Sequence, residues 1–329
     1  MGLFNKLFKK NEAAQIPAPV SAQTPASTAT PAQESLCPNK DTIMGFALLH
    51  TAELSEEELT GAIKEEFGPE TATEVSRDNL FSVIVSREEA QFICTLMPFA
   101  VPDHEVEKLF PFHSLSPEAE LEMGRHQAFL IIAGNGFELE KKREACLAFN
   151  RLCGAVMRLE QAVAMYMGGA GLLLEKEIYL RHVEIIKSPV GEDRNYFPAP
   201  LWIRVLLYLD DGKKMARTDG LADFGYPDVC VFNTHQEPEA LYQQLYLMAI
   251  EEITGRGVYR SGDLIRIDEE TEAVCKLADG VLHIIGTACT NTGEFSTNAS
   301  QPQRTCIFAA VRYFYYRERL PVIRQSFLH

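Results

Sequence analysis

The sequence lacks an uncharged apolar run long enough to cross a lipid bilayer. Its longest such stretch, Gln161–Leu174, is well short of the ~20 residues that a transmembrane helix needs. Near the start, the apolar segment Leu3–Phe8 is too short for the hydrophobic region of a secretory signal peptide. We therefore expect a cytoplasmic protein.

The eight cysteines include no CxxC pair, the spacing typical of zinc ribbons and redox motifs. Most have apolar neighbours, as in Phe92-Ile93-Cys94 and Val229-Cys230-Val231. This pattern is typical of small, buried thiols in a reducing compartment.

Motifs with known chemistry are also missing. The chain has no GxSxG elbow, SxxK motif, kinase set, HExxH pair, Walker loop or GxGxxG fingerprint. His50, His126 and His283 stand in strand-like patterns typical of structural histidines, and His104 and His113 do not have a zinc-ligand spacing. We assign no catalytic residue, expect no cofactor or metal, and lean against an enzyme, although a Cys–His pair can form through the fold alone.

Positive charge is scarce in the middle of the chain. Residues 1–40 carry four lysines against two glutamates, and residues 290–329 carry five arginines against two glutamates. Because the net charge of the whole chain is −15, residues 41–289 carry a formal charge of −20. So acidic a core repels a phosphate backbone, which argues against nucleic-acid binding there.

Residues 1–10 contain a short apolar stripe. Leu3, Phe4, Leu7 and Phe8 stand at helical spacing, with lysines elsewhere around the helix. One interpretation is a basic amphipathic anchor that makes weak contact with an anionic membrane or a partner groove. The other is a leader without a stable helix, because an isolated helix this short is marginal in water. Gly2 does not begin a complete myristoylation motif, since position 6 is a lysine.

Composition divides the chain into three parts. Residues 1–40 are predicted to be a disordered leader and linker, because residues 12–40 are mostly Ala, Pro, Thr, Ser and Gln. Residues 41–289 are predicted to be one globular domain, and a subdivision would fall in the Pro- and charge-rich stretch 188–200. Residues 290–329 form an atypical basic and aromatic tail, for which an appended helix, a partner-binding tail and unrelated sequence stay open.

The core alternates strand-like and helix-like segments in the order β-α-β-β-α-β-α-β-α, then β-β-β-α-β-β. Ser55–Glu58 is a capping box that predicts the start of the first helix. Leu172–Ile186 is predicted to be one helix, and Asp210-Asp211-Gly212 a hairpin turn. Hairpins mixed with crossover helices predict an α+β fold with a mixed, largely antiparallel sheet and covering helices. A distant duplication is conceivable, but no sequence period supports it.

Two segments are candidate sites. The turn Gly168-Gly169-Ala170-Gly171, between a predicted strand and a predicted helix, could present backbone N–H groups to an anion. The alternative is a tight turn that permits close packing.

The second segment is Thr218–Asp228, in which three carboxylates and two glycines form an acidic loop. Clustered carboxylates can bind a cation, a ligand or a partner, although turn-forming aspartates explain the pattern too. The candidate ligand or partner surface comprises Thr218, Asp219, Gly220, Asp223, Gly225, Asp228, Gly168, Gly169 and Gly171.

Several of these stretches resemble a bacterial family catalogued as domain of unknown function 4261. The resemblance covers approximately residues 44–289. It implies a shared α+β domain and supplies no activity or catalytic residue. The stretches that carry it are His50–Phe67, Met97–Pro102, Tyr166–Gly171, Leu201-Trp202, Thr218–Asp228 and Gly262-Asp263.

Three hypotheses for function follow. The first is a non-enzymatic cytoplasmic protein with a protein partner, for example an immunity-type protein that occupies a basic toxin. The second is a small-ligand-binding protein or an enzyme that uses the loop at residues 218–228. The third is a membrane-peripheral scaffold attached through residues 1–10.

Overall fold

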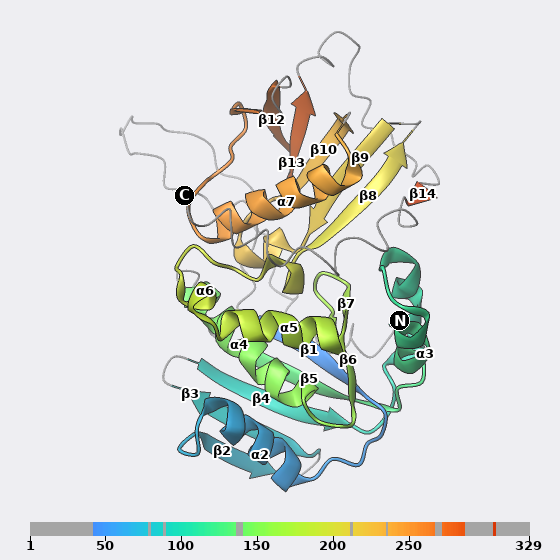
Figure 1. The fold of residues 1–329 in the computed structure, drawn as a ribbon, viewed down its shortest axis with the longest axis vertical. Coiled ribbons are helices and arrows are strands. Elements are labelled where there is room, and N and C mark those ends of the chain that lie inside the picture. Colours follow the sequence, from blue (N-terminus) through green and yellow to red (C-terminus); the bar gives the residue numbers. More distant parts are fainter. Residues whose placement is uncertain are drawn as a thin grey trace, which may run out of the picture.

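The structure, a computed structural model, describes residues 42–77, 80–87, 90–135, 141–210, 213–234, 236–266, 272–286 and 305–306. The described strands form two sheets of seven strands each, which lie one above the other in Figure 1. We call the lower one sheet A and the upper one sheet B. The fold is α+β, as predicted, with two sheets in place of the single sheet that the sequence suggested.

Sheet A is antiparallel at every strand pair that the structure describes. Strand β1, which lies between β5 and β6, is apolar and almost wholly buried, which suits a strand with a neighbour on each side. In spatial order the strands are β2 (Ala72–Ser76), β3 (Ser82–Arg87), β4 (Ala90–Met97), β5 (Ala128–Asn135), β1 (Thr42–Leu49), β6 (Ala162–Met167) and β7 (Leu172–Glu175).

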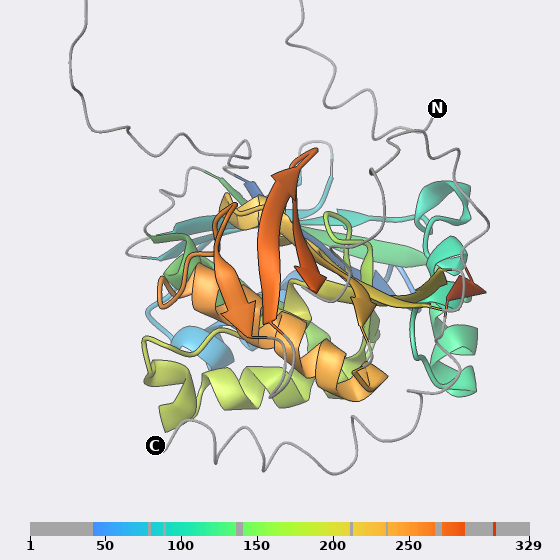
Figure 2. The same cartoon turned by 90° about the horizontal axis from the view of Figure 1, so that it is seen from above.

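Helices cover one face of sheet A. These are α2 (Glu56–Phe67), α4 (Lys142–Met157) and α5 (Lys176–Ile186), and Figure 2 shows α5 on one side of the strands. The first begins where the sequence predicts: Ser55 Oγ accepts a hydrogen bond from the Glu58 N–H at 3.1 Å, and the Glu58 carboxylate accepts one from the Ser55 N–H at 2.9 Å. The predicted capping box is therefore confirmed.

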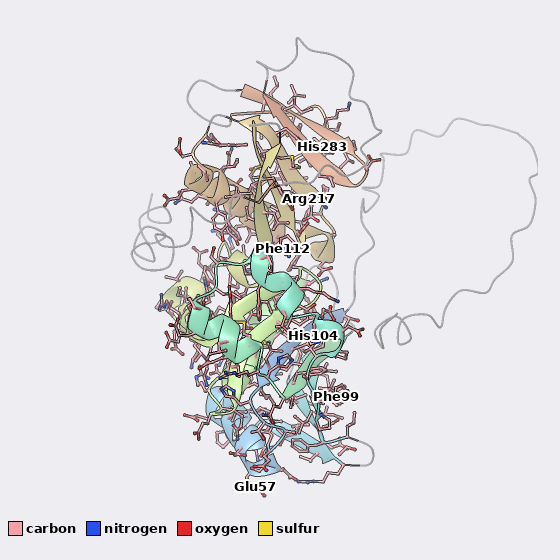
Figure 3. All side chains as sticks on the ribbon, turned by 90° about the vertical axis from the view of Figure 1, so that its right-hand side faces the viewer. Glu57, Phe99, His104, Phe112, Arg217 and His283 are labelled. Atoms are coloured by element: carbon pink, nitrogen blue, oxygen red, sulfur yellow. The ribbon has the colours of Figure 1, made fainter. Side chains whose placement is uncertain are left out.

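A second layer covers part of the opposite face. It comprises η1 (Pro102–His104), η2 (Glu107–Phe112) and α3 (Pro117–Met123), and it lies at one end of the strands in Figure 2. Its apolar side chains pack with Phe46, Phe129 and Tyr166 of the sheet. Figure 3 shows Phe99, His104 and Phe112 along the side of the molecule formed by this layer and its entry from β4.

Sheet B is covered by α7 (Pro238–Ile253), which crosses the strands in Figure 1. Among its described strands, β10 and β13 pair in parallel and the other pairs are antiparallel. In spatial order they are β11 (Leu264–Arg266), β12 (Glu272–Ala278), β13 (Val281–Gly286), β10 (Asp228–Thr234), β9 (Lys213–Asp219), β8 (Arg204–Asp210) and β14 (Thr305–Cys306). The last pair of residues belongs to the predicted tail and lies against β8.

The two sheets share a unit of one strand, one helix and a three-stranded meander. In sheet A the unit is β1-α2-β2-β3-β4, and in sheet B it is β10-α7-β11-β12-β13. In both, the last strand runs in the direction of the first. In sheet B these two strands pair directly, whereas in sheet A β5 lies between them.

The predicted helix Leu172–Ile186 is wrong at its start. Its first four residues form β7, which pairs with β6 through Met167 and Leu172, and the helix α5 begins at Lys176. Leu172 and Leu174 pack in the larger apolar core while Leu173 packs under the η1–α3 layer. Side chains that alternate between two faces follow the period of a strand.

Strands β2 and β12 were missed, and the connection at residues 188–200 contains α6 (Pro189–Glu192) and η4 (Ala199–Leu201). The predicted hairpins are confirmed as β3–β4 and β8–β9. The leader, and the tail apart from residues 305–306, lie outside the described residues.

One large apolar core runs through both sheets. It joins the inner side chains of sheet A and its helices to those of sheet B and α7, and includes Phe149, Trp202 and Leu241. Across the described residues, no helix is both long enough and apolar enough to span a membrane.

Candidate functional site

The structure brings the two predicted segments together at the place where sheet A meets sheet B. The Gly168–Gly171 turn links β6 to β7, and the Thr218–Asp228 loop runs from β9 through η5 (Leu221–Phe224) into β10. A Cβ atom on Gly169 would lie 2.8 Å from Asp223 Oδ2, and one on Gly220 would lie 3.4 Å from the Ala170 Cβ. We call this region the inter-sheet joint.

The glycine turn is not followed directly by a helix, which corrects the prediction from sequence. Gly171 leads into β7, and α5 begins at Lys176. A positive helix end therefore does not stand behind this turn, so no helix dipole attracts an anion to it. The turn permits close approach instead, because a side chain on Gly169 would collide with Asp223 of the facing loop, and one on Gly171 would crowd Arg204.

Arg204, which the sequence did not suggest, connects the two segments. Its Nη1 donates a hydrogen bond to the Gly171 carbonyl oxygen at 3.0 Å, and its Nη2 donates to Asp219 Oδ2 at 2.8 Å. Arg204 begins β8 and stands opposite Asp219 in the β8–β9 ladder. Arg217 also lies 3.3 Å from Asp219 Oδ1, so this carboxylate is held by two cations.

A buried lysine makes a second connection. Lys142 begins α4 and is 3% exposed, and its ammonium donates a hydrogen bond to the Asp223 carbonyl oxygen. The same ammonium stands over the Phe224 ring, 5.6 Å from its centroid. Phe224 in turn packs edge-to-face against Trp202, with ring centroids 5.9 Å apart. A charge from α4, a helix that covers sheet A, thus lies against an aromatic cluster and a carbonyl at the base of sheet B.

Asp228 stabilises the loop through hydrogen bonds with other residues of the same loop. Its Oδ1 accepts hydrogen bonds from the Thr218 hydroxyl and the Leu221 N–H, each at 3.1 Å. The Thr218 oxygen also accepts a bond from the Val229 N–H at 2.8 Å. Burial raises the pKa of Asp228 to about 6, although the backbone hydrogen bond opposes this.

Two glycines of the loop have backbone conformations that other residues rarely adopt. Gly220 has a φ of +123°, and a Cβ there would lie 2.5 Å from the Trp202 carbonyl oxygen. Gly225 has a φ of +81° and ends η5. These positions therefore need glycine for the shape of the loop.

The three carboxylates of the loop have three different sets of partners. Asp219 faces two arginines, Asp223 lies against the glycine turn and the lysine contact, and Asp228 binds the loop itself. Within the part of the chain that the structure describes, no group of three or more His, Cys, Asp or Glu side chains could hold a metal ion. The geometry is that of a junction in which hydrogen bonds and ion pairs hold the two sheets together.

Three buried N–H groups at the joint have no hydrogen-bond acceptor among the described residues. One of them, Arg217 Nε, lies 3.3 Å from Asp219 Oδ1 in an ion pair. The other two, Trp202 Nε1 and Arg204 Nε, have neither kind of contact among the described residues. Buried donors are normally satisfied by protein or water. This is the feature of the joint that internal contacts do not account for.

The described histidines that lie deepest serve as structural acceptors. His113 accepts a hydrogen bond from the Leu173 N–H at 3.0 Å, and burial lowers its pKa to about 4. His126 accepts one from the Val101 N–H at 2.8 Å. His283 stacks on Phe232 in sheet B, where Figure 3 shows it above Arg217. These contacts account for His113, His126 and His283 as structural residues.

Five cysteines are buried and free, as the sequence predicted: Cys94, Cys146, Cys153, Cys230 and Cys275. Burial raises the pKa of Cys94 to about 12 and also raises the pKa of Cys146 and of Cys153. Such thiols are protonated and unreactive at neutral pH.

One titratable group was missed by sequence reasoning. Glu252, on the last turn of α7, is 1% exposed and accepts a hydrogen bond from the Tyr259 N–H at 3.3 Å. Its Oε2 atom has no hydrogen-bond partner among the described residues. Burial raises the pKa of Glu252 to about 7.

A second candidate site is an uncovered apolar row on sheet A, on the face away from α2 and α4. Each residue stands directly across from the next: Glu74 and Ile84, Ile84 and Ile93, Ile93 and Ala133, Ala133 and Met44. We call this row the open face of sheet A. Val83 and Val85, on either side of Ile84, point the other way into the core.

The open face is accessible at its centre. Ile93 is 38% exposed, and Ile84 is half-buried. Neither belongs to the apolar clusters formed by the described residues. The η1–α3 layer packs on β6, on parts of β1 and β5, and on Met97 at the end of β4. Met44, at the β1 end of the row, is half-buried against the same layer, whereas Ile84 and Ile93 lie outside it.

Comparisons of the chain with protein-family models, with curated proteins and with solved structures found no match. The resemblance to domain of unknown function 4261 therefore stays a prediction.

Proposed function

We propose that this chain is a cytoplasmic, non-enzymatic protein-interaction protein that binds its partner on the open face of sheet A. The observation that supports the proposal is the apolar row from Ile84 through Ile93 to Met44, which carries a 38% exposed isoleucine at its centre. Contiguous exposed apolar surface on a folded protein commonly marks an interaction site.

Charge favours a particular kind of partner. Residues 41–289 carry a formal charge of −20, and exposed Glu74 ends the apolar row. A partner with apolar side chains flanked by lysine or arginine fits both properties. A basic toxin bound by an immunity-type protein would have this chemistry.

The inter-sheet joint supports the non-enzymatic part of the proposal. Its charged groups are engaged in holding the sheets together: Arg204 with Asp219 and Gly171, and Lys142 with Asp223. A general acid or base needs to reach a substrate proton. Groups tied to backbone and to each other are better suited to fixing the fold.

The test compares two substitutions of exposed apolar residues in an immobilised full chain. Ile93→Lys places a cation in the open face, whereas Leu247→Lys changes a 49% exposed leucine on α7 in sheet B. We expect wild type and Leu247→Lys to retain a stoichiometric partner from native lysate, with association weakened by salt, and Ile93→Lys to lose it. Recovery of nothing at low salt, or equal recovery by both variants, would contradict the proposal.

A second candidate function is small-ligand binding at the joint. The unpartnered N–H groups of Trp202 and Arg204, next to the Gly168–Gly171 turn, favour it. Inorganic phosphate, nucleotides and divalent metals are the probes for a thermal-shift screen, because a ligand selective for the folded state raises its stability. A shift that persists in Leu247→Lys and disappears in Asp219→Ala would support this function, and no shift across the screen would exclude it for these ligands.

A further inference from the structure

The open face of sheet A lies beside the point where residues 1–41 join the described part of the chain. Thr42 is the first residue of β1, and Met44, two residues further on, belongs to the open face. The chain that precedes β1 therefore arrives at the half-buried end of the row, and the exposed Ile93 lies two strands further on.

That preceding chain carries a segment of matching chemistry. Leu3, Phe4, Leu7 and Phe8 would form one apolar stripe along a helix over residues 3–10. Such a helix is ~12 Å long. The row from Ile84 to Met44 crosses β3, β4, β5 and β1, which is three strand spacings or ~14 Å. The stripe and the row have the same extent.

The segment between residue 10 and β1 is long enough for residues 3–10 to reach the row, and short enough to keep their local concentration high. Residues 11–41 are rich in Ala, Pro, Thr and Ser, and a flexible chain of that length has an end-to-end distance of ~30 Å. Tethering of this kind gives a local concentration on the order of millimolar. A contact too weak to form between separate molecules can therefore form within one chain.

Charge complements the apolar match. Lys6, Lys9 and Lys10 flank the stripe, and the described core that receives it is acidic, with Glu74 at one end of the row. An isolated helix of this length is marginal in water. Burial of its four large apolar side chains on a sheet would supply the favourable free energy that the isolated helix lacks.

We propose that residues 3–10 dock as an amphipathic helix on the open face of sheet A of the same chain. The segment would occupy the same row of residues that is proposed above for a partner. The inference deepens the proposed function and rests on its choice of surface. A partner with an amphipathic basic segment would compete for the same row of residues.

The test places a photo-crosslinking amino acid, p-benzoylphenylalanine, at Phe4 of the full chain and maps the products by mass spectrometry. We expect a crosslink within one chain to peptides that contain β3, β4 or β5, with a yield that does not change on dilution. The crosslink should fall at least several-fold in Ile93→Lys and stay unchanged in Leu247→Lys. Phe8→Asp, outside the described core, gives a second variant that should lower the yield without affecting the fold of the sheets.

Each other outcome overturns the proposal. A yield that falls in proportion to dilution would mean that a second copy receives the segment. Crosslinks to lipid in vesicles of anionic phospholipid, without crosslinks to sheet A, would mean a membrane anchor. No crosslink to sheet A, or equal yields in Ile93→Lys and Leu247→Lys, would also overturn it. Partner capture by the open face is measured separately in a chain that lacks residues 1–10, so failure of self-docking leaves the proposed function testable.

Discussion

Glu66 shows how a single buried charge is accommodated in this fold. Its carboxylate is wholly buried and lies 2.8 Å from Arg151 Nε, 2.8 Å from Arg158 Nη1 and 3.1 Å from Lys187 Nζ. Burial alone would raise the pKa of Glu66, but hydrogen bonds from these three cations outweigh it and hold the pKa below its ordinary value. The carboxylate therefore joins α2, α4 and the end of α5.

We expect Glu66→Gln to lower the free energy of unfolding by about 2 kcal/mol, because the variant leaves three cations around a neutral group. Urea unfolding at pH 7 measures this. Glu184→Gln, which removes a 63% exposed partner of Arg158, should cost less than about 0.5 kcal/mol. Because the folded pKa of Glu66 is lowered, its contribution is present above the unfolded pKa and is lost as pH falls through the folded value. Equal effects of the two substitutions would contradict this account.

Glu252 has the opposite pH dependence. Its pKa is raised to about 7 in the folded protein, so the folded state holds this proton more tightly than the unfolded state. Stability should therefore fall as pH rises from the unfolded pKa to about 7 and level off above it. Glu252→Gln removes this dependence and should raise stability at pH 8 by about 2 kcal/mol.

Asp228 and His113 also titrate in part of this range. Chemical denaturation of wild type and Glu252→Gln at pH 5 and pH 8 isolates the contribution of Glu252 by difference. A constant difference between the two proteins at both pH values would show that Glu252 is not the responsible group.

In the Thr218–Asp228 loop, the backbone conformation of Gly220 restricts which residues can stand at that position. Gly220 combines a φ of +123° with a would-be Cβ contact of 2.5 Å to the Trp202 carbonyl oxygen. Gly262 also has a positive φ, +98°, but a Cβ there would meet nothing within 4 Å. The pair separates backbone strain from steric collision.

We expect Gly220→Ala to destabilise the protein by about 3 kcal/mol and Gly262→Ala by about 1 kcal/mol. Thermal denaturation followed by circular dichroism measures both. A smaller effect at Gly220 than at Gly262 would mean that the loop moves freely away from Trp202, which would contradict the fastened geometry.

Sequence rules for helix caps and hairpins predicted the features that depend only on residues close together in the chain. The capping box at Ser55 and the hairpin pairing of β8 with β9 depend on neighbouring residues, and both are confirmed, while Asp211 and Gly212 of the predicted turn lie outside the described residues. Leu172–Glu175 was misread because three consecutive leucines fit a buried helix as well as a buried strand. The short edge strand β2 was missed because its residues are mostly polar or small.

The candidate site was predictable as two loops, but their meeting was not. Lys142 reaches Asp223 from 81 positions away, and Arg204 reaches Gly171 from 33 positions away. A cation in an unremarkable helix or strand gives no sign in the sequence of such a distant partner. The open face was also hidden, because Ile84 and Ile93 read as ordinary residues of a strand until the covering layers were placed.

Both sheets should unfold together. One apolar core runs through them, and the single tryptophan, Trp202, lies between Phe149 of α4 and Phe224 of the loop. We expect tryptophan fluorescence and far-ultraviolet circular dichroism to give coincident urea transitions. A fluorescence transition at lower urea would show that the sheets separate before they unfold. Lys142→Met, which removes the buried ammonium, provides a variant in which such separation is easiest to detect.

The shared strand–helix–meander unit indicates how such a fold could gain a strand. In sheet A the unit admits β5 between its first and last strands, and in sheet B the same two strands touch. A parallel contact can therefore be opened to accept an additional strand while the helix and the meander keep their places. The same arrangement offers protein engineers a position for inserting a new strand between β10 and β13.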